Sequence, residues 1–119
     1  MKKLTVYGYM KCDTCRRALK WLEAHECDTE FIDITQDPPN AATLGALLDT
    51  GDYQLKQLLN TSGRAYREPG VKDKLAAMGR DETLTYLAGE GMLIKRPIVT
   101  DGTRFTVGFR ETAFDAAWG

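Results

Sequence analysis

The sequence lacks any apolar stretch that approaches the ~18 residues of a membrane-spanning helix. It also lacks a secretory leader, because residues 1–7 pass from charge directly into a strand-like alternation without an apolar run or a cleavage site. We therefore expect a cytoplasmic protein that has no membrane partner.

The sequence also lacks an excess of charge of either sign. It has 16 Lys and Arg residues against 17 Asp and Glu residues, for a net charge of −1. A nucleic-acid-binding surface needs a basic excess, so we expect no direct contact with nucleic acid. A protein partner is still compatible, because its surface needs to be complementary only locally.

Cysteine and histidine are scarce as well, with three cysteines and one histidine. In a reducing compartment, so few cysteines argue against a disulfide framework and favour a reactive or metal-binding role. The other residues are ordinary for a globular protein, with 43% hydrophobic and 28% charged. The length fits a single domain, residues 1–119, that can bury a core without disulfides or a metal.

The first third of the chain predicts a βαβ unit over about residues 3–36. Residues 4–9 are β-branched and aromatic, as in a buried strand, and residues 29–35 alternate with period two. Between them, residues 13–25 have the apolar and charged faces of an amphipathic helix. Two strands joined through a helix are expected to be parallel.

The middle of the chain, about residues 40–91, predicts a helical insert. Leucine-rich segments there indicate helices that begin after Asn40, near Leu55 and after Gly70. A fourth helix is expected to begin with Asp81 as its N-cap.

The end of the chain, about residues 96–118, predicts a ββα unit. Residues 97–100 and 104–109 indicate a hairpin around an Asp-Gly turn, and a final helix from about residue 110 follows. The whole order predicts an α/β, thioredoxin-like (glutaredoxin-like) fold. Its four-stranded mixed sheet would be shared by the βαβ and ββα halves, with the helical insert between them.

The motif Cys12-Asp-Thr-Cys15 lies directly after the first strand and before the first helix. Unpaired N–H groups and a partial positive charge at a helix N-terminus favour a thiolate, so the pKa of Cys12 should be lowered. Arg16 would add positive charge. Cys12 is the expected nucleophile, and Cys15, one turn further on, would resolve a mixed disulfide.

Two other interpretations of the cysteines are open. They could be small core residues, or they could form half of a zinc site with His25 and Cys27. The second interpretation is difficult within one chain, because His25 and Cys27 lie at the far end of the same helix, about 15 Å or more from Cys12. It would require a metal shared across a dimer, so we expect no metal site.

The second motif, Arg96-Pro97, lies at the start of the third predicted strand. The thioredoxin arrangement has a cis-proline at this strand start, facing the cysteine motif, so we expect Pro97 to be cis and to contact substrate. Arg96 would direct its guanidinium at an oxyanion beside Cys12. The alternative is an ordinary strand entry with Arg96 in solvent.

Together these motifs resemble the arsenate reductase/Spx/MgsR family, and in particular its CxxC-bearing branch. The resemblance runs nearly end to end. It is carried by Tyr-x-Tyr-x-Lys-Cys12-x-Thr-Cys15-Arg16-x-Ala18-x-x-Trp21-Leu22-Glu23, by Pro38-Pro39, by Leu93-Ile94-x-Arg96-Pro97 and by Val107-Gly108-Phe109.

The resemblance implies roles for further residues. Glutaredoxin-dependent arsenate reductases of this family use the nucleophilic cysteine, the arginine before the proline and two more arginines. One of those two positions is Asn60 here and the other lies near Val107 and Gly108, so neither is arginine. Candidate substitutes are Arg64, Arg67 and Arg104. The substrate-binding candidates are Thr14, Arg16, Pro97 and Asn60.

The resemblance also offers two functions. The first is a thiol–disulfide redox protein, an oxidoreductase that binds no cofactor and receives electrons from glutathione, thioredoxin or glutaredoxin. The second is an Spx-like regulator, in which the CxxC motif is a redox switch for binding the α subunit of RNA polymerase. The basic C-terminal tail of those regulators is absent from this sequence.

Overall fold

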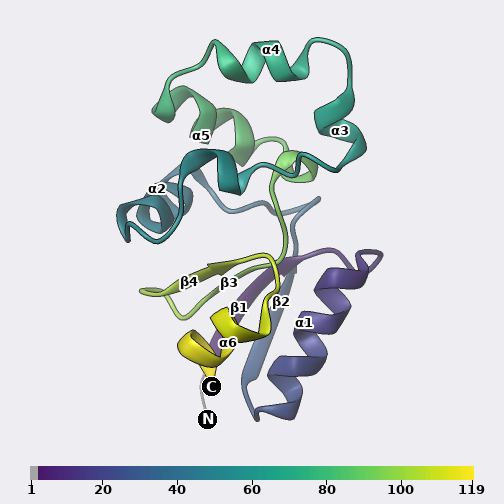
Figure 1. Ribbon diagram of the computed structural model, residues 1–119, viewed down its shortest axis with the longest axis vertical. Coiled ribbons are helices and arrows are strands. Elements are labelled where there is room, and N and C mark those ends of the chain that lie inside the picture. Colours follow the sequence, from purple (N-terminus) through teal and green to yellow (C-terminus); the bar gives the residue numbers. More distant parts are fainter. Residues whose placement is uncertain (1–2) are drawn as a thin grey trace. The chain divides into compact units, whose positions relative to one another are not determined.

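The computed structural model describes residues 3–119 and contains two compact units (Figure 1). The first comprises the chain up to Ile34 together with Arg96–Gly119, and it holds every strand of the sheet. The second comprises Thr35–Lys95 and is helical. We call them the α/β unit and the helical unit and describe each by itself.

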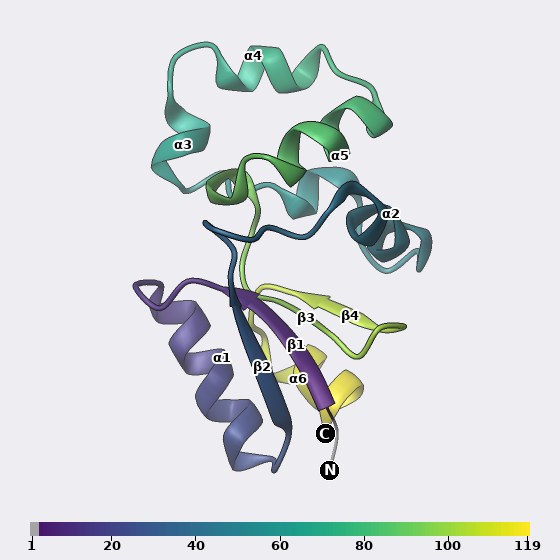
Figure 2. The ribbon, with the colours of Figure 1, turned by 180° about the vertical axis from the view of Figure 1, so that it is seen from behind.

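The sheet of the α/β unit has four strands in the order β2-β1-β3-β4 (Figure 2). Strand β1 (Lys3–Gly8) pairs in parallel with β2 (Asp28–Asp33) and antiparallel with β3 (Ile98–Thr100), which pairs antiparallel with β4 (Phe105–Val107). The sheet is therefore mixed. The predicted α/β, thioredoxin-like fold is confirmed.

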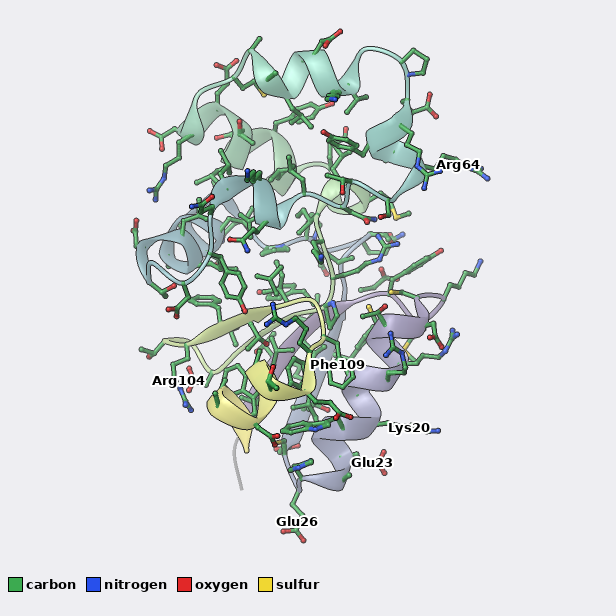
Figure 3. All side chains as sticks on the ribbon, viewed as in Figure 1. Lys20, Glu23, Glu26, Arg64, Arg104 and Phe109 are labelled. Carbon is green, nitrogen blue, oxygen red and sulfur yellow. The ribbon has the colours of Figure 1, made fainter. Side chains whose placement is uncertain are left out.

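Helices α1 (Asp13–Ala24) and α6 (Glu111–Trp118) pack on the same face of this sheet (Figure 1). Their apolar side chains meet those of β1 and β3 in one buried cluster, formed by Leu4, Val6, Ala18, Leu22, Val99, Phe114 and Trp118. The charged residues Lys20 and Glu23 point outward from α1 (Figure 3). This division into an apolar and a charged face is what fixes the rotation of α1 on the sheet.

The helical unit contains four α-helices and two short 3₁₀ helices within Thr35–Lys95. They are α2 (Ala41–Asp49), η1 (Leu55–Leu58), α3 (Arg64–Arg67), α4 (Val71–Ala76), α5 (Arg80–Ala88) and η2 (Gly91–Leu93). Asn40 caps α2 by accepting a hydrogen bond from the backbone N–H of Thr43 at 2.8 Å. Helices α2 and α5 are in contact, and Arg80 donates to Asp49 across 2.8 Å.

Several local predictions differ from the structure. Asp81 is not an N-cap: α5 begins at Arg80 after Gly79, which places Asp81 in the first turn, where its charge suits the N-terminal dipole. The short helices α3 and η2 were not predicted, because neither is long enough to show a helical period. The predicted hairpin is present, with β3 and β4 three residues each and its turn formed by residues 101–104. No helix within residues 3–119 is long and apolar enough to cross a membrane.

Candidate active site

Cys12 is the N-cap residue of α1. Its backbone is extended (φ −93°, ψ 117°), and its carbonyl accepts the hydrogen bond from the N–H of Arg16 at 3.1 Å. The Cys12 N–H donates to the carbonyl of Tyr9 at 2.9 Å, which closes the loop between β1 and α1. The side chain is half-buried. The sulfur is thus held at a helix N-terminus and reachable from solvent.

Cys15 lies one helical turn further on and is completely buried. Its sulfur accepts a hydrogen bond from the backbone N–H of Tyr9 at 3.4 Å. Gly8 makes room for it: a Cβ atom at position 8 would lie 3.2 Å from Cys15 Sγ and 3.1 Å from the Phe31 ring. The end of β1 therefore forms the wall against which the second sulfur packs.

The two cysteines have opposite acidities. Burial alone would raise the pKa of Cys12, but hydrogen bonds from the Cys15 N–H, the Cys15 thiol and the Arg96 guanidinium, with the charge of Arg96, outweigh burial and lower it. For Cys15, burial dominates and raises the pKa to about 12. One site therefore holds a sulfur disposed to be a thiolate beside a sulfur that stays a thiol.

The peptide bond between Arg96 and Pro97 is cis, as predicted. Pro97 is buried, and its carbonyl accepts a hydrogen bond from the N–H of Gly108 at 2.9 Å. Arg96 is half-buried rather than in solvent, and its guanidinium carbon lies 5.4 Å from the centre of the Tyr9 ring. The guanidinium of Arg96 hydrogen-bonds the Cys12 sulfur, so the two residues lie together, as the motif predicted.

The predicted substrate-binding residues Thr14 and Arg16 lie in the first turns of α1. Arg16 is exposed and donates to the carbonyl of Met10 at 2.7 Å, with Asp13 at 3.6 Å. Arg16 is not among the causes of the lowered Cys12 pKa, so its expected contribution is taken over by Arg96. Thr14 accepts a hydrogen bond from Arg17 at 3.4 Å.

The candidate arginines outside the motifs have other partners. Arg104 lies in the hairpin turn, where it pairs with Asp101 at 3.1 Å and covers the Trp118 ring, at the opposite end of β3 from Pro97. It is therefore not a substitute at the cysteine site. Arg67 donates to the carbonyl of Ser62 at 2.5 Å.

Asn60 and Arg64 also belong to the helical unit. The backbone N–H of Asn60 donates to the carbonyl of Leu93 at 2.8 Å, and Arg64 is exposed at the start of α3 (Figure 3). The role of Asn60 in substrate binding stays a prediction.

The third cysteine lies away from the motif. Cys27 follows α1 at its far end, half-buried, with its sulfur 3.9 Å from the carbonyl of Trp118. His25 is exposed and stacks on the Trp21 ring with a centroid distance of 3.6 Å. Within residues 3–119 no three His, Cys, Asp or Glu side chains are grouped so as to hold a metal.

Two residues of the site, Gly8 and Tyr9, are not predicted by any motif in the sequence. Gly8 was assigned only as part of a strand, although a glycine at the end of an apolar strand is a known signal of a close approach. Tyr9 was predicted to be the last residue of that strand, whereas β1 ends at Gly8 and Tyr9 contacts both cysteines and Arg96. Its contacts come from loop geometry, which has no sequence signal.

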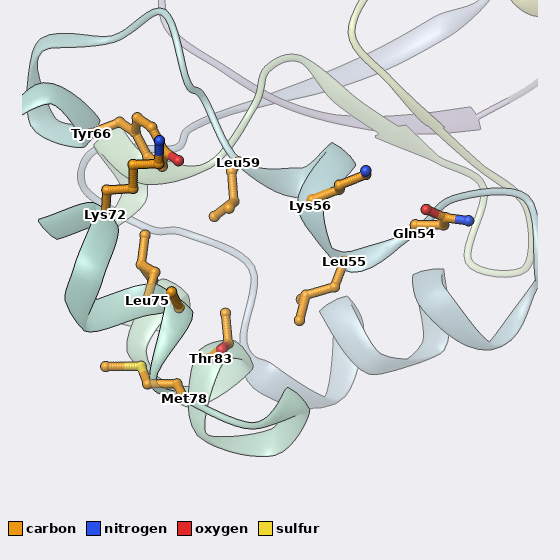
Figure 4. Close-up of a pocket in the computed structure, with 10 residues that line it drawn as sticks. Gln54, Leu55, Lys56, Leu59, Tyr66, Lys72, Leu75, Met78 and Thr83 are labelled. Carbon is orange, nitrogen blue, oxygen red and sulfur yellow. The ribbon is translucent and has the colours of Figure 1, made fainter.

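The helical unit has a pocket of its own, with a cavity volume of about 440 Å³ (Figure 4). Leucine, alanine and methionine side chains form half of its lining, and Gln54, Lys56, Tyr66, Lys72 and Thr83 are its polar and charged members. All of its lining residues fall between Gln54 and Thr83, so none of the cysteines lines it. All three cysteines belong to the α/β unit.

Comparison with known proteins gives one family. A model of the ArsC family matches residues 7–117. The chain is 50% identical over 115 residues to the uncharacterized protein YusI of Bacillus subtilis, which covers 97% of this chain and 98% of that protein. A solved structure described as a possible arsenate reductase from Streptococcus mutans is 42% identical, with a TM-score of 0.81 and coverage of 90% of this chain and 91% of that chain.

A more distant relative is named as a transcriptional regulator. The global transcriptional regulator Spx of Enterococcus faecalis is 28% identical over 108 residues, which are 91% of this chain and 80% of that protein. The cysteine motif and Arg96-Pro97 both fall inside the residues that the family model matches. This chain, with its thioredoxin-like sheet and its paired thiols, therefore belongs to the ArsC family.

Proposed function

We propose that this protein is a thiol–disulfide oxidoreductase in which Cys12 is the nucleophile. The observation that carries the proposal is the pair of opposite acidities at one helix N-terminus: a reachable Cys12 with a lowered pKa above a buried Cys15 with a raised one. The thiolate is the attacking species in thiol–disulfide exchange, so Cys12 is prepared to attack and Cys15 is not.

In the first step the Cys12 thiolate attacks one sulfur of a substrate disulfide. The new bond joins Cys12 to that sulfur, the substrate S–S bond breaks, and the other sulfur leaves as a thiolate that takes a proton from water. The positive charge of Arg96 stabilises the anionic sulfur before the attack and an anionic substrate beside it.

In the second step Cys15 gives its proton to the hydroxide left by the first step, and its thiolate attacks the Cys12 sulfur. A Cys12–Cys15 disulfide forms and the substrate's second sulfur is released as a thiolate. Two molecules of glutathione, or one thioredoxin or glutaredoxin dithiol, would then reduce the disulfide and be oxidised in turn. Such a cycle suits the reducing cytoplasm, and it requires no bound cofactor.

Arsenate is a less suitable substrate than a disulfide. It is a polyanion, and the two further arginines of the family's arsenate reductases are replaced here, one of them by Asn60. Each charge-assisted contact contributes about 1.5–3 kcal/mol, so the loss of two weakens oxyanion binding by several kcal/mol. We propose that Thr14, Pro97 and Asn60 contact the substrate, with Arg96 as its main cationic partner.

The test is steady-state reduction of hydroxyethyl disulfide with glutathione, and in parallel with thioredoxin, each coupled to oxidation of NADPH through its reductase. We expect turnover by the wild type and none by Cys12→Ser. Cys27→Ser is the matched control and should keep full turnover, because Cys27 lies outside the motif. A Cys12→Ser variant with wild-type turnover would contradict the proposal.

The likeness to Spx favours a second candidate, a redox-switched regulator that binds the α subunit of RNA polymerase. In this case the Cys12–Cys15 disulfide changes affinity for a partner rather than turning over. A pull-down with purified α subunit, using the oxidised protein and the reduced protein, separates the two functions. Equal binding, or none, in both states would argue against the regulator.

A further inference from the structure

Tyr9 contacts all three working groups of the proposed site. Its carbonyl accepts from the N–H of Cys12 at 2.9 Å, and its N–H donates to the sulfur of Cys15 at 3.4 Å. Its ring lies 5.4 Å from the guanidinium carbon of Arg96. The backbone of this loop residue thus fixes the two cysteines, while its side chain meets the cation.

We propose that Tyr9 is a positioning residue, whose ring holds the Arg96 guanidinium beside the Cys12 sulfur. The inference rests on the proposed function, since it concerns how that site maintains its thiolate. The ring acts through Arg96, whereas the hydrogen bonds of Tyr9 to the two cysteines come from its backbone. Its role is therefore electrostatic positioning rather than catalysis.

The arginine side chain is long and flexible. An arginine loses substantial rotamer freedom when it is held in one place, so a single charge–sulfur attraction competes with that entropy. The face of an aromatic ring carries a negative quadrupole and attracts a cation within about 6 Å of its centre. Tyr9 and Arg96 are both half-buried, which reduces the screening of this attraction by water.

The attraction has a consequence for the chemistry. Arg96 lowers the pKa of Cys12 through a hydrogen bond and through its charge, and both effects weaken quickly if the guanidinium moves away. Tyr9 therefore maintains the Cys12 thiolate indirectly. It also keeps the same cation available to an anionic substrate, so its removal should affect anionic substrates more than neutral ones.

An alternative is that the Tyr9 ring only fills space. The same unit provides a matched comparison, because Arg17 covers the Phe109 ring at 5.7 Å, in a pair that includes neither motif cysteine nor Arg96. Loss of the Phe109 ring removes a similar amount of aromatic surface. If filling space were the only role, Tyr9 and Phe109 would have equivalent effects on Cys12.

The test measures the pKa of Cys12 from the pH dependence of its alkylation by iodoacetamide, with the modified residue identified by mass spectrometry. For Tyr9→Leu we expect the pKa to rise by about half a unit, and alkylation below the pKa to slow about threefold. Tyr9→Phe, which keeps the ring, should remain near the wild type, and Phe109→Leu should leave the Cys12 pKa unchanged.

Substrate preference gives a second readout that a structural role would not change. In Tyr9→Leu, with thioredoxin and its reductase as the electron source, the KM for glutathione disulfide, which is anionic, should rise more than the KM for neutral hydroxyethyl disulfide. In an Arg96→Gln background, Tyr9→Leu should have no further effect on the Cys12 pKa, because its action passes through Arg96. Additive effects of the two substitutions would overturn the inference.

A folded Tyr9→Leu variant with the wild-type Cys12 pKa and the wild-type substrate preference would also overturn the inference. Turnover that still depends on Cys12 would, in that case, leave the proposed function unaffected. If Tyr9→Leu does not fold, phenylalanine and pentafluorophenylalanine at position 9 replace it, since they differ little in shape but greatly in the charge of the ring face. Equal Cys12 pKa values for those two variants would overturn the inference. An ordinary pKa for Cys12 in the wild type would instead contradict the proposed function.

Discussion

Cys12 and Cys15 lie one helical turn apart, and each shifts the acidity of the other in the opposite direction. The Cys15 N–H and thiol lower the pKa of Cys12, while burial and then the neighbouring Cys12 raise the pKa of Cys15 to about 12. A proton shared across this pair therefore stays on Cys15. Both residues are cysteines, so the difference between their pKa values comes from their surroundings.

The first prediction concerns selective alkylation. At neutral pH, iodoacetamide should modify Cys12 in the folded, reduced protein and leave Cys15 unmodified, because only Cys12 is both reachable and lowered in pKa. Peptide mass spectrometry after a short exposure measures this. Modification of Cys15 at the same rate as Cys12 would contradict it, and unfolding in urea should abolish the difference.

The second prediction concerns stability at alkaline pH. Because the folded-state pKa of Cys15 is about 12, against 9.0 as the ordinary value, the unfolded chain loses this proton first as the pH rises. The stabilising effect is complete below pH 9.0 and is lost progressively towards pH 12. The free energy of unfolding should fall by roughly 1 kcal/mol per pH unit from this group.

Urea denaturation under reducing conditions at several pH values measures this loss. Cys15→Ala should show a shallower decline than the wild type. Ala18→Gly, a small change at another buried position of α1, should lower stability without changing the slope. Identical slopes for Cys15→Ala and the wild type would contradict the raised pKa.

The third prediction compares one substitution at two glycines. Gly8→Ala would place a methyl group 3.2 Å from Cys15 Sγ and 3.1 Å from the Phe31 ring, so it should destabilise the protein by about 1–3 kcal/mol. Gly45→Ala, within α2, meets its nearest neighbour at 3.8 Å and should stabilise by about 0.5–1 kcal/mol through helix propensity. Chemical denaturation measures both. Effects of the same sign would show that the crowding at Gly8 is relieved elsewhere.

The fourth prediction concerns a buried hydrogen bond between α6 and β4. The indole N–H of Trp118 donates to the hydroxyl of Thr106 at 3.1 Å, and both residues are buried. Thr106→Val keeps the shape but leaves the indole N–H without its acceptor, which should cost about 1–3 kcal/mol of unfolding free energy. Thr106→Ser keeps the hydroxyl and should restore part of that loss, whereas equal losses for the two variants would argue against the hydrogen bond.

Much of the fold could be predicted from the sequence because local and tertiary signals agree. The alternation in β2, the two faces of α1 and the order of the elements all indicated the sheet that the structure contains. Gly79 and Asp81 show where this approach fails: both can begin a helix, and the choice between them depends on how α5 packs.

The sequence predicts the candidate site only at residues that belong to a recognisable motif. Cys12, Cys15 and the cis peptide at Arg96-Pro97 follow from their positions at a helix start and a strand start. The contacts of Tyr9 depend on the path of a four-residue loop, residues 9–12, between two regular elements. No periodicity or spacing encodes that path, so the sequence does not predict these contacts.

The helical unit is one uninterrupted segment, Thr35–Lys95, and the next residue along the chain is Arg96. A chimera that exchanges this segment between relatives therefore needs only two junctions. The second junction must be made before Lys95 if the cis peptide and its arginine are to stay native. Such exchanges would allow one thiol centre to be combined with helical segments from enzymes or from regulators, which would show whether partner choice is encoded outside the sheet.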